Sequence, residues 1–143
     1  MTALVSLGAL AVLAYGGFCA LLYFTQRSML YFPTAESQHT SAAAVHLSTD
    51  GVRLKIWHVA RGTDTAVVYF GGNAEDVAWN IDGLAATLPS ADLYLVNYRG
   101  YGGTPGEPSE EALYEGALAV YDYLVASKRA APGRVVGWCR REH

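Results

Sequence analysis

A long apolar segment near the amino terminus constrains the fold of this chain more than any other feature. From Ala3 to Phe24 there are 22 residues without a charged side chain. With a rise of about 1.5 Å per residue, a helix of this length spans roughly the 30 Å hydrocarbon core of a bilayer. We therefore interpret residues 1–25 as a transmembrane anchor that contacts the lipid bilayer through residues 3–24. A folded domain has to be built from the residues that follow.

A secretory signal peptide is the alternative interpretation of the apolar segment. Signal peptides usually place basic residues before an apolar core of about 7–15 residues. Here the run is longer, and no Lys or Arg precedes it. Arg27 is the one charge near the end of the segment, so the positive-inside rule does not resolve on which side of the membrane the domain lies. The predicted localisation is a single-pass membrane protein.

Composition argues against several classes of partner. The formal net charge is −3 and no run of like charges occurs, so neither a nucleic-acid surface nor a polybasic lipid-binding patch is indicated. The two cysteines, Cys19 and Cys139, lie in environments too different to suggest a disulfide. The four histidines are scattered without the spacing of metal ligands. We predict no metal and no cofactor.

The strand pattern predicts an α/β domain over residues 44–143, after a short polar linker over residues 26–43. The segments Ala44–Thr49 and Arg53–Ala60 alternate apolar and polar positions around Asp50-Gly51, which is typical of an antiparallel hairpin. Three further apolar runs predict buried parallel strands. These runs are Ala66–Phe70, Leu93–Asn97 and the segment that starts at Arg134.

Two amphipathic helices are predicted between these strands. The first covers Ala74–Leu88, with Asn73 as its cap and a shared apolar face formed by Val77, Ile81, Leu84 and Leu88. The second begins after Ser109, and its apolar face is formed by Leu113, Ala117, Val120 and Leu124. Alternation of strands and helices predicts an α/β layered architecture.

Two glycine-containing turns carry the candidate chemistry. The strand, Gly-Gly-Asn, helix pattern at Gly71–Asn73 places backbone N–H groups at the carboxyl end of a strand, where an oxyanion is stabilised. The same pattern also occurs as a simple tight connection. The loop Asn97–Ser109 is interpreted as scaffold in which Arg99 binds neighbouring carbonyls or carboxylates. Its glycines lack the spacing of a dinucleotide-binding fingerprint.

Together, the segments Phe70–Asp76 and Asn97–Glu110 resemble the α/β-hydrolase superfamily, specifically the membrane-anchored BEM46-like and ABHD13-like group of serine hydrolases. The segment Gln26–Thr34 is similar to that group as well. The resemblance implies an eight-stranded hydrolase sheet and hydrolysis of an acyl-type small molecule, an ester, thioester or amide. It also implies an oxyanion donor from the backbone of Gly72, Asn73 or Ala74. Many members of the group have His-Gly-Asn where this chain has Gly-Gly-Asn.

The resemblance also indicates where the nucleophile should lie. The superfamily carries Gly-x-Ser-x-Gly after the strand that begins here at Arg134, and its Asp and His follow later in the chain. The corresponding stretch is Gly137-Trp138-Cys139-Arg140-Arg141, with Cys139 at the nucleophile position. His143 is poorly placed as a base for Cys139, and no orienting acid follows it. We therefore expect no catalytic residue, and a reading frame that is lost near Gly137.

Two functional hypotheses follow from these residues. The first is a membrane-anchored serine hydrolase that is truncated before its nucleophile and inactive as this chain. The alternative is a non-catalytic membrane interaction protein with a hydrolase-like domain. In the superfamily's strand order, Val67–Phe70 lies between Leu93–Asn97 and the strand from Arg134. That last strand would then expose an unpaired apolar edge, so we expect the isolated chain to fold poorly or aggregate.

Overall fold

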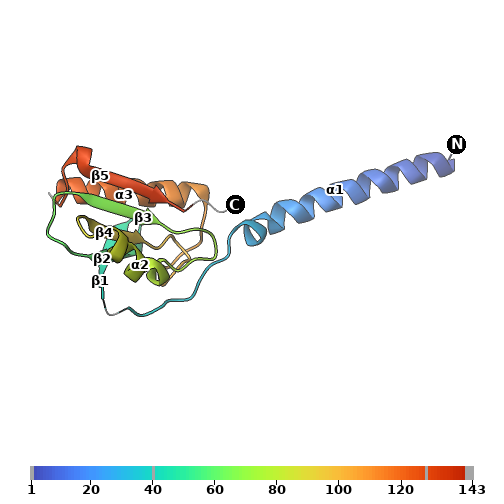
Figure 1. Cartoon of the computed structure of the whole chain (residues 1–143). Coiled ribbons are helices and arrows are strands. Elements are labelled where there is room, and N and C mark those ends of the chain that lie inside the picture. Colours follow the sequence, from blue (N-terminus) through green and yellow to red (C-terminus); the bar gives the residue numbers. More distant parts are fainter. Residues whose placement is uncertain (1, 40, 128, 141–143) are drawn as a thin grey trace. The chain divides into compact units, whose positions relative to one another are not determined.

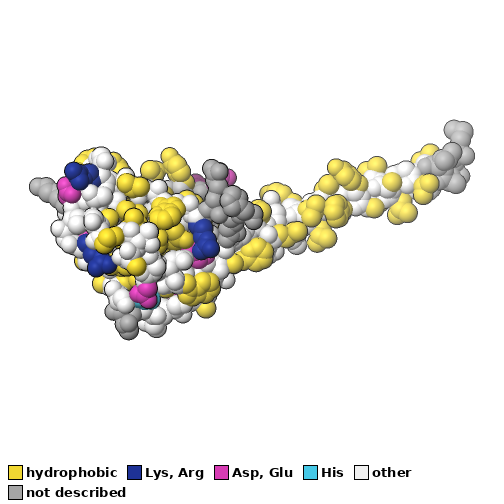
Figure 2. Space-filling view, viewed as in Figure 1, with side chains coloured by type: hydrophobic (Ala, Val, Ile, Leu, Met, Phe, Trp, Pro, Cys, Tyr) yellow, Lys and Arg dark blue, Asp and Glu magenta, His cyan; other side chains and the backbone are white. Residues whose placement is uncertain are grey.

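The structure is a computed structural model that describes residues 2–39, 41–127 and 129–140. The chain divides into two units, Met1–Phe32 and Pro33–His143. The first unit contains the helix α1, Thr2–Leu30. Within its segment Val5–Leu30, the most apolar 18 residues have a mean hydropathy of 2.0, and none of them is buried. Hydrophobic side chains recur along the visible surface of this helix (Figure 2), which is long and apolar enough to cross a membrane.

The second unit is built on a five-stranded mixed sheet in the order β1-β2-β4-β3-β5 (Figure 1). The strands are β1 Ala43–Thr49, β2 Val52–Val59, β3 Ala66–Phe70, β4 Asp92–Val96 and β5 Val135–Cys139. β1, β2 and β4 pair antiparallel, whereas β3 pairs parallel with both β4 and β5. The predicted hairpin and the predicted position of β3 between its two neighbours are both confirmed.

Backbone conformation explains the hairpin turn. Asp50 and Gly51 have φ values of 46° and 70°, the left-handed pair that a two-residue type I′ turn requires. Asp and Gly tolerate this conformation, and the turn matches the right-handed twist of the strands that it joins. The Asp-Gly signal in the sequence therefore fixed the register of β1 against β2.

Two hydrophobic clusters, one on each face of the sheet, hold the helices in place. Val67 and Tyr69 of β3 pack in the cluster that contains Ile81. Their neighbour Val68 faces the other way and packs in the cluster that contains Val120 and Leu124. The helices α2, Ile81–Thr87, and α3, Glu110–Ala126, accordingly lie on opposite faces of the sheet (Figure 1). Such coverage of both faces is what a parallel strand with a continuous apolar sequence needs.

The first predicted helix, Ala74–Leu88, starts later than expected. A 3₁₀ turn, η1, covers Val77–Asn80, and α2 follows it. The cap is Asp76, whose side chain accepts a hydrogen bond from the Ala78 N–H, and not Asn73. Ala74 has a φ of 58°, a left-handed conformation that no α-helix includes. The prediction was wrong because residues 73–76 form a turn of their own.

The second predicted helix has the expected start and a slightly rotated face. Ser109 accepts a hydrogen bond from the Ala112 N–H, as predicted for the cap of α3. The buried positions are Ala112, Gly116, Val120 and Leu124, so the first half of the predicted face is shifted by one residue. A Cβ at Gly116 would lie 3.4 Å from Leu54 Cδ1 of β2. A small residue there lets the helix pack close to the sheet, which a ranking by hydrophobicity misses.

Strand β5 is less buried than its apolar sequence predicts. Val135 is half-buried, and the other four residues of the strand are exposed. The exposed fractions of Val136 and Trp138 are 53% and 44%. Pairing with β3 satisfies one edge of β5, but no other element in the described ranges covers the strand. The expectation of a buried third parallel strand was therefore wrong.

Candidate oxyanion loop at the carboxyl edge of the sheet

Three segments leave the sheet at one edge. Because β3, β4 and β5 are parallel and in register, Phe70 lies beside both Val96 and Cys139. The loop after β3, the loop after β4 and Arg140 after β5 therefore start next to one another. In open α/β sheets, ligands bind outside the carboxyl ends of the strands, where neighbouring connections diverge. This edge is the candidate site.

The turn after β3 contains the three predicted oxyanion donors. The Gly72 N–H donates to Glu75 Oε2 over 2.8 Å, and the Ala74 N–H donates to Asn73 Oδ1 over 3.1 Å. Gly71 has to lack a side chain, since a Cβ would lie 2.8 Å from Val77 Cγ1. The structure thus brings Gly72, Asn73 and Ala74 together on one tight turn. Their role as donors to an oxyanion stays a prediction.

A buried amide connects the turn after β3 to the loop after β4. Asn97 is 1% exposed, and its Oδ1 accepts the Val77 N–H over 3.4 Å. Its Nδ2 donates to the Gly102 carbonyl over 3.3 Å. From the far side of the turn, the Tyr101 hydroxyl donates to Asn73 Oδ1 over 2.8 Å. The two loops therefore behave as one hydrogen-bonded unit.

Arg99 fixes the other end of the loop after β4. Its guanidinium lies 3.3 Å from Asp50 in the hairpin turn and 3.4 Å from Glu115 on α3. These are the carboxylate contacts that the sequence predicted for Arg99. The residue holds the glycine-containing loop between two elements and does not face the turn after β3.

The segment Thr34–Ser37 crosses both loops, although it falls in the region predicted as a linker. The Gly102 N–H donates to the Thr34 carbonyl over 3.1 Å, and the Ser37 N–H donates to Asp76 Oδ2 over 3.0 Å. Between these bonds, Glu36 binds the buried ammonium of Lys55 over 2.7 Å. Sequence reasoning missed this segment because small polar residues bind here through their backbone, which leaves no pattern of hydrophobicity.

Cys139 lies at the carboxyl end of β5, exposed and with a free thiol. Beside it, the Tyr98 ring stacks on Phe70 with centroids 5.7 Å apart. Burial raises the pKa of the Tyr98 hydroxyl well above its ordinary value of 10.0, and the adjacent Cys139 adds to the rise. Tyr98 therefore stays a neutral phenol and is no base for the thiol. Arg141 and His143, the other residues named in the nucleophile hypothesis, lie outside the described residues.

The described histidines lie away from Cys139. His58 Nε2 is 3.1 Å from Asp92 Oδ2, at the start of β4 and thus at the opposite end of the sheet. His39 Nε2 is 3.6 Å from Asp82 on α2, and His46 lies on β1, the far edge strand. Within residues 2–39, 41–127 and 129–140, no three His, Cys, Asp or Glu side chains are grouped so that they could hold a metal ion.

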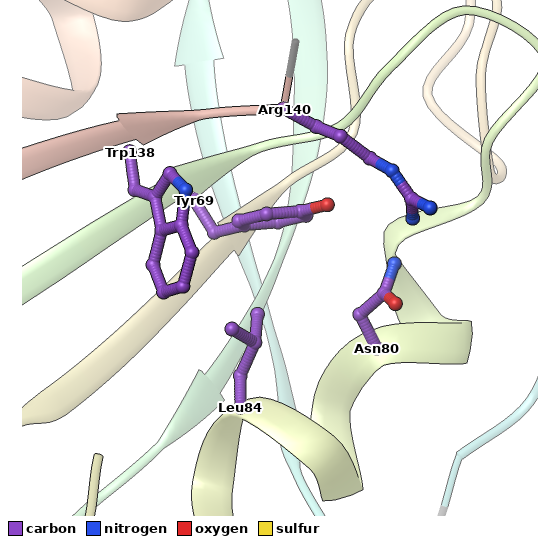
Figure 3. A pocket seen from close by; sticks show the side chains of 5 residues that line it. All are labelled: Tyr69, Asn80, Leu84, Trp138 and Arg140. Atoms are coloured by element: carbon purple, nitrogen blue, oxygen red, sulfur yellow. The ribbon is translucent and has the colours of Figure 1, made fainter. Parts of the chain in front are cut away.

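A pocket of about 210 Å³ opens beside β5 on the sheet face that α2 covers (Figure 3). Its lining consists of Tyr69, Asn80, Leu84, Trp138 and Arg140. Trp138 packs edge-on against the Tyr69 ring, with centroids 6.2 Å apart. Burial raises the pKa of Tyr69 to about 12, and the hydrogen bond to Glu75 adds to the rise. The phenol is therefore a neutral hydrogen-bond donor at the polar end of this pocket.

The antiparallel hairpin, the strand order β4-β3-β5 and the glycine turn after β3 define the amino-terminal part of an α/β-hydrolase sheet. Solved structures share this fold. The esterase Pf2001 of Pyrococcus furiosus matches 76% of this chain and 48% of its own, with a TM-score of 0.64 and 15% identity. An α/β-hydrolase from Vibrio vulnificus matches 68% of this chain and 34% of its own length, with a TM-score of 0.58 and 25% identity. The Cif epoxide hydrolase of Acinetobacter nosocomialis matches 73% of this chain and 32% of its own length, with a TM-score of 0.59 and 11% identity.

Sequence relatives agree with this assignment. An uncharacterized protein of Mycobacterium tuberculosis is 32% identical over 139 residues, which are 89% of this chain and 49% of the relative. The α/β-hydrolase domain-containing protein WAV2 of Arabidopsis thaliana is 26% identical over 136 residues, 82% of this chain and 44% of WAV2. No family model matches the sequence. The chain thus has part of an α/β-hydrolase fold and is similar in sequence to an α/β-hydrolase domain-containing protein, and it spans about half the length of these curated relatives.

Proposed function

We propose that this chain is the amino-terminal part of a membrane-anchored α/β-hydrolase that cleaves esters, thioesters or amides by acyl transfer. The glycine turn after β3 supports the proposal most directly. It lies at the carboxyl edge of the sheet, where Glu75 accepts the Gly72 N–H and the Tyr101 hydroxyl donates to Asn73 Oδ1. An esterase among the solved structures of similar fold is consistent with acyl chemistry.

In acyl transfer, the attack of a nucleophile turns the substrate carbonyl oxygen into an oxyanion that needs N–H donors. Losing one such donor typically costs about 2.7–4 kcal/mol of transition-state stabilisation. In the turn after β3, the Gly72 N–H donates to the carboxylate of Glu75 and the Ala74 N–H to the neutral amide of Asn73. Hydrogen bonds to a charged acceptor are the stronger ones. We therefore assign the Ala74 N–H as the donor that an oxyanion captures, while Gly72 stays bound to Glu75.

We further propose that the chain by itself is catalytically inactive. At the position where the superfamily carries its serine, β5 ends in Cys139. The histidines in the described part of the chain, His39, His46 and His58, lie elsewhere in the fold. A thiol without a base to deprotonate it and an acid to orient that base is a weak nucleophile for esters.

A fluorophosphonate probe tests this proposal, because it labels serine nucleophiles that are activated by a triad. We expect no labelling and no ester hydrolysis by the chain alone. A fusion of residues 1–137 to the remaining half of the Mycobacterium tuberculosis relative should label and hydrolyse p-nitrophenyl esters. The matched control replaces the serine of the fused half by alanine. Hydrolysis by the chain alone, or a folded fusion without labelling, contradicts the proposal.

A non-catalytic membrane interaction protein is the second candidate, favoured by the exposed strand β5 with Val136 and Trp138. This alternative requires the same fusion to remain unlabelled although it is folded. It also requires the unfused chain to be recovered from cells in a stable complex. Recovery of the chain only as an aggregate, together with a labelled fusion, would exclude it.

Membrane anchoring through α1 has a test of its own. We expect the chain to stay with the membrane pellet after alkaline carbonate extraction, because an apolar helix of this length is held by the hydrocarbon core. Intact-mass analysis should find the residues of α1 still attached. A mature form that begins after Phe24 would instead identify the segment as a signal peptide.

A further inference from the structure

We propose that Glu75 is a positioning residue whose carboxylate fixes the backbone of the Gly71–Ala74 turn and so aims its N–H groups. The inference rests on the proposed function for its catalytic meaning. Its structural part, the control of the turn by one buried carboxylate, can be measured without any activity.

Glu75 is only 7% exposed, and its two carboxylate oxygens bind groups from four places in the fold. Oε2 accepts the Gly72 N–H over 2.8 Å and lies 3.6 Å from Arg140 Nη1. Oε1 accepts the Tyr69 hydroxyl over 2.8 Å and also binds Asn80 Nδ2. A buried carboxylate is tolerated when it is satisfied in this way, and it then holds its partners firmly.

The turn needs such an external constraint, because its own conformation is unfavourable. Ala74 has a φ of 58°, and a residue with a Cβ in this region persists only where its surroundings fix it. The Glu75 side chain also lies against the turn, since a Cβ on Gly71 would be 3.4 Å from Glu75 Cδ, an ordinary contact distance. The bond from the Gly72 N–H to the Glu75 carboxylate closes the segment from Gly72 to Glu75, which contains Asn73 and Ala74.

The partners of Glu75 lie where the oxyanion site of a hydrolase is assembled. One donor of such a site comes from the loop after β3 and the other from the residue that follows the nucleophile at the end of the next parallel strand. Glu75 binds the Gly72 N–H in the first of these places. At the end of β5 it reaches only the Arg140 side chain, whose guanidinium lies 3.6 Å away, while the Arg140 N–H donates to the Phe70 carbonyl over 3.2 Å. Capping of η1 does not require it, since Asp76 already provides the cap. The geometry therefore assigns Glu75 to the alignment of the donors in the loop after β3.

Amide hydrogen exchange of Gly72 tests the structural part in the full chain, solubilised in detergent micelles and observed by NMR. Glu75→Gln removes the charge but keeps the shape of the side chain. We expect the Gly72 amide to exchange at least about tenfold faster in this variant, since the bond to the carboxylate is lost. Its proton resonance should also move upfield. The control is Glu111→Gln, an exposed glutamate on α3, which should leave both quantities unchanged.

Tyr69→Phe distinguishes the bond between Glu75 and Gly72 from the other contacts of the Glu75 carboxylate. It removes one donor to Glu75 and leaves the Gly72 bond in place, so Gly72 should remain protected. Should Glu75→Gln fail to fold, Tyr69→Phe and Asn80→Ala each weaken the placement of the carboxylate, and both together should raise the Gly72 exchange rate. Unchanged Gly72 exchange in Glu75→Gln, or in that double variant, overturns the proposal.

The fusion to the second half of the Mycobacterium tuberculosis relative tests the catalytic part. Glu75→Gln in the active fusion should lower kcat by about ten- to a hundredfold with little change in KM, because the oxyanion forms only in the transition state. An unchanged kcat overturns the positioning role. An inactive wild-type fusion counts against the proposed function instead, and the Gly72 exchange measurement then decides alone whether Glu75 fixes the turn.

Discussion

Asp92 is a buried carboxylate at the end of the sheet opposite the candidate site. Its Oδ1 accepts the N–H groups of Arg61 and Thr63 over 2.8 and 3.2 Å, and its Oδ2 faces His58. Burial alone would raise the pKa of Asp92, but these hydrogen bonds outweigh burial and lower it from its ordinary value of 3.8. The charged form is therefore the one that stabilises the fold.

Replacement of Asp92 by Asn should cost about 1–3 kcal/mol at pH 7, because the loop N–H groups and His58 lose a charged acceptor. The sign of the pH dependence follows from the lowered pKa of Asp92. Its contribution is present at every pH above about 4 and is lost as the pH falls through the folded-state pKa. Urea unfolding at pH 7, 5 and 3 should show that the free energy of unfolding falls less with decreasing pH in the variant than in the wild-type chain. Asp64→Asn, at an exposed ion pair, should keep the wild-type profile.

Three glycines separate the cost of a left-handed backbone from the cost of a steric clash. Gly102 has a φ of 50°, and a Cβ there would lie 2.2 Å from Asn97 Oδ1. Gly62 has a φ of 73° with open space, and Gly133 has neither constraint. Alanine should lower the free energy of unfolding by more than about 2 kcal/mol at Gly102 and by about 1 kcal/mol at Gly62. At Gly133 it should change this free energy by less than about 0.5 kcal/mol. Denaturant midpoints that do not follow this order would show that the loop rearranges around Asn97.

At the scale of elements, helix α3 depends on the side chain that precedes it. The Ser109 hydroxyl accepts the Ala112 N–H over 3.1 Å, and Glu110 and Glu111 occupy the first turn. Ser109→Ala should destabilise the domain by about 1 kcal/mol, and Ser109→Asp should restore the loss, since Asp caps equally well. Thermal unfolding checks both. Equal melting temperatures for Ser109→Ala and the wild-type chain would mean that tertiary packing alone fixes the start of the helix.

Strands and turns with local signals could be predicted from the sequence, and so could the cap of α3. Asp50-Gly51 and Ser109 act on their immediate neighbours, so their signals are visible without a structure. The turn at Gly71–Ala74 is different. Its conformation depends on Glu75, which is held in turn by Tyr69 and Asn80. The expectation that Asn73 caps the helix therefore misplaced its start by several residues.

The candidate site could be located from the sequence but not built from it. The Gly-Gly-Asn pattern after an apolar strand predicts a tight turn at the carboxyl edge of the sheet, and the structure has a turn there. The contacts of Thr34 and Ser37 with this edge pass through backbone groups, and backbone hydrogen bonds leave no trace in residue type. The buried Lys55, bound to Glu36, was equally invisible, because strand periodicity does not reveal ion pairs between distant segments.

At the scale of the whole molecule, β5 governs the behaviour of the chain in solution. One of its edges pairs with β3, and Val136 and Trp138 are exposed on one face. Unprotected apolar strands of this kind template aggregation. Replacing Val136 and Trp138 by lysine should raise the soluble fraction of the detergent-free domain several-fold in size-exclusion chromatography. Lysine at Tyr114 and Leu118, exposed apolar positions on α3, should have a smaller effect.

The strand order also sets a waiting time during synthesis. β3 receives its first neighbour when β4 is complete at Val96, but its second neighbour is complete only at Cys139. At about 5–20 residues per second, the ribosome needs about 2–9 s for the interval between them. For those seconds one edge of the most apolar strand has no partner within the nascent chain. Slow codons between residues 97 and 139 would lengthen this exposure, so the speed of translation there should influence how much of the protein reaches its folded state.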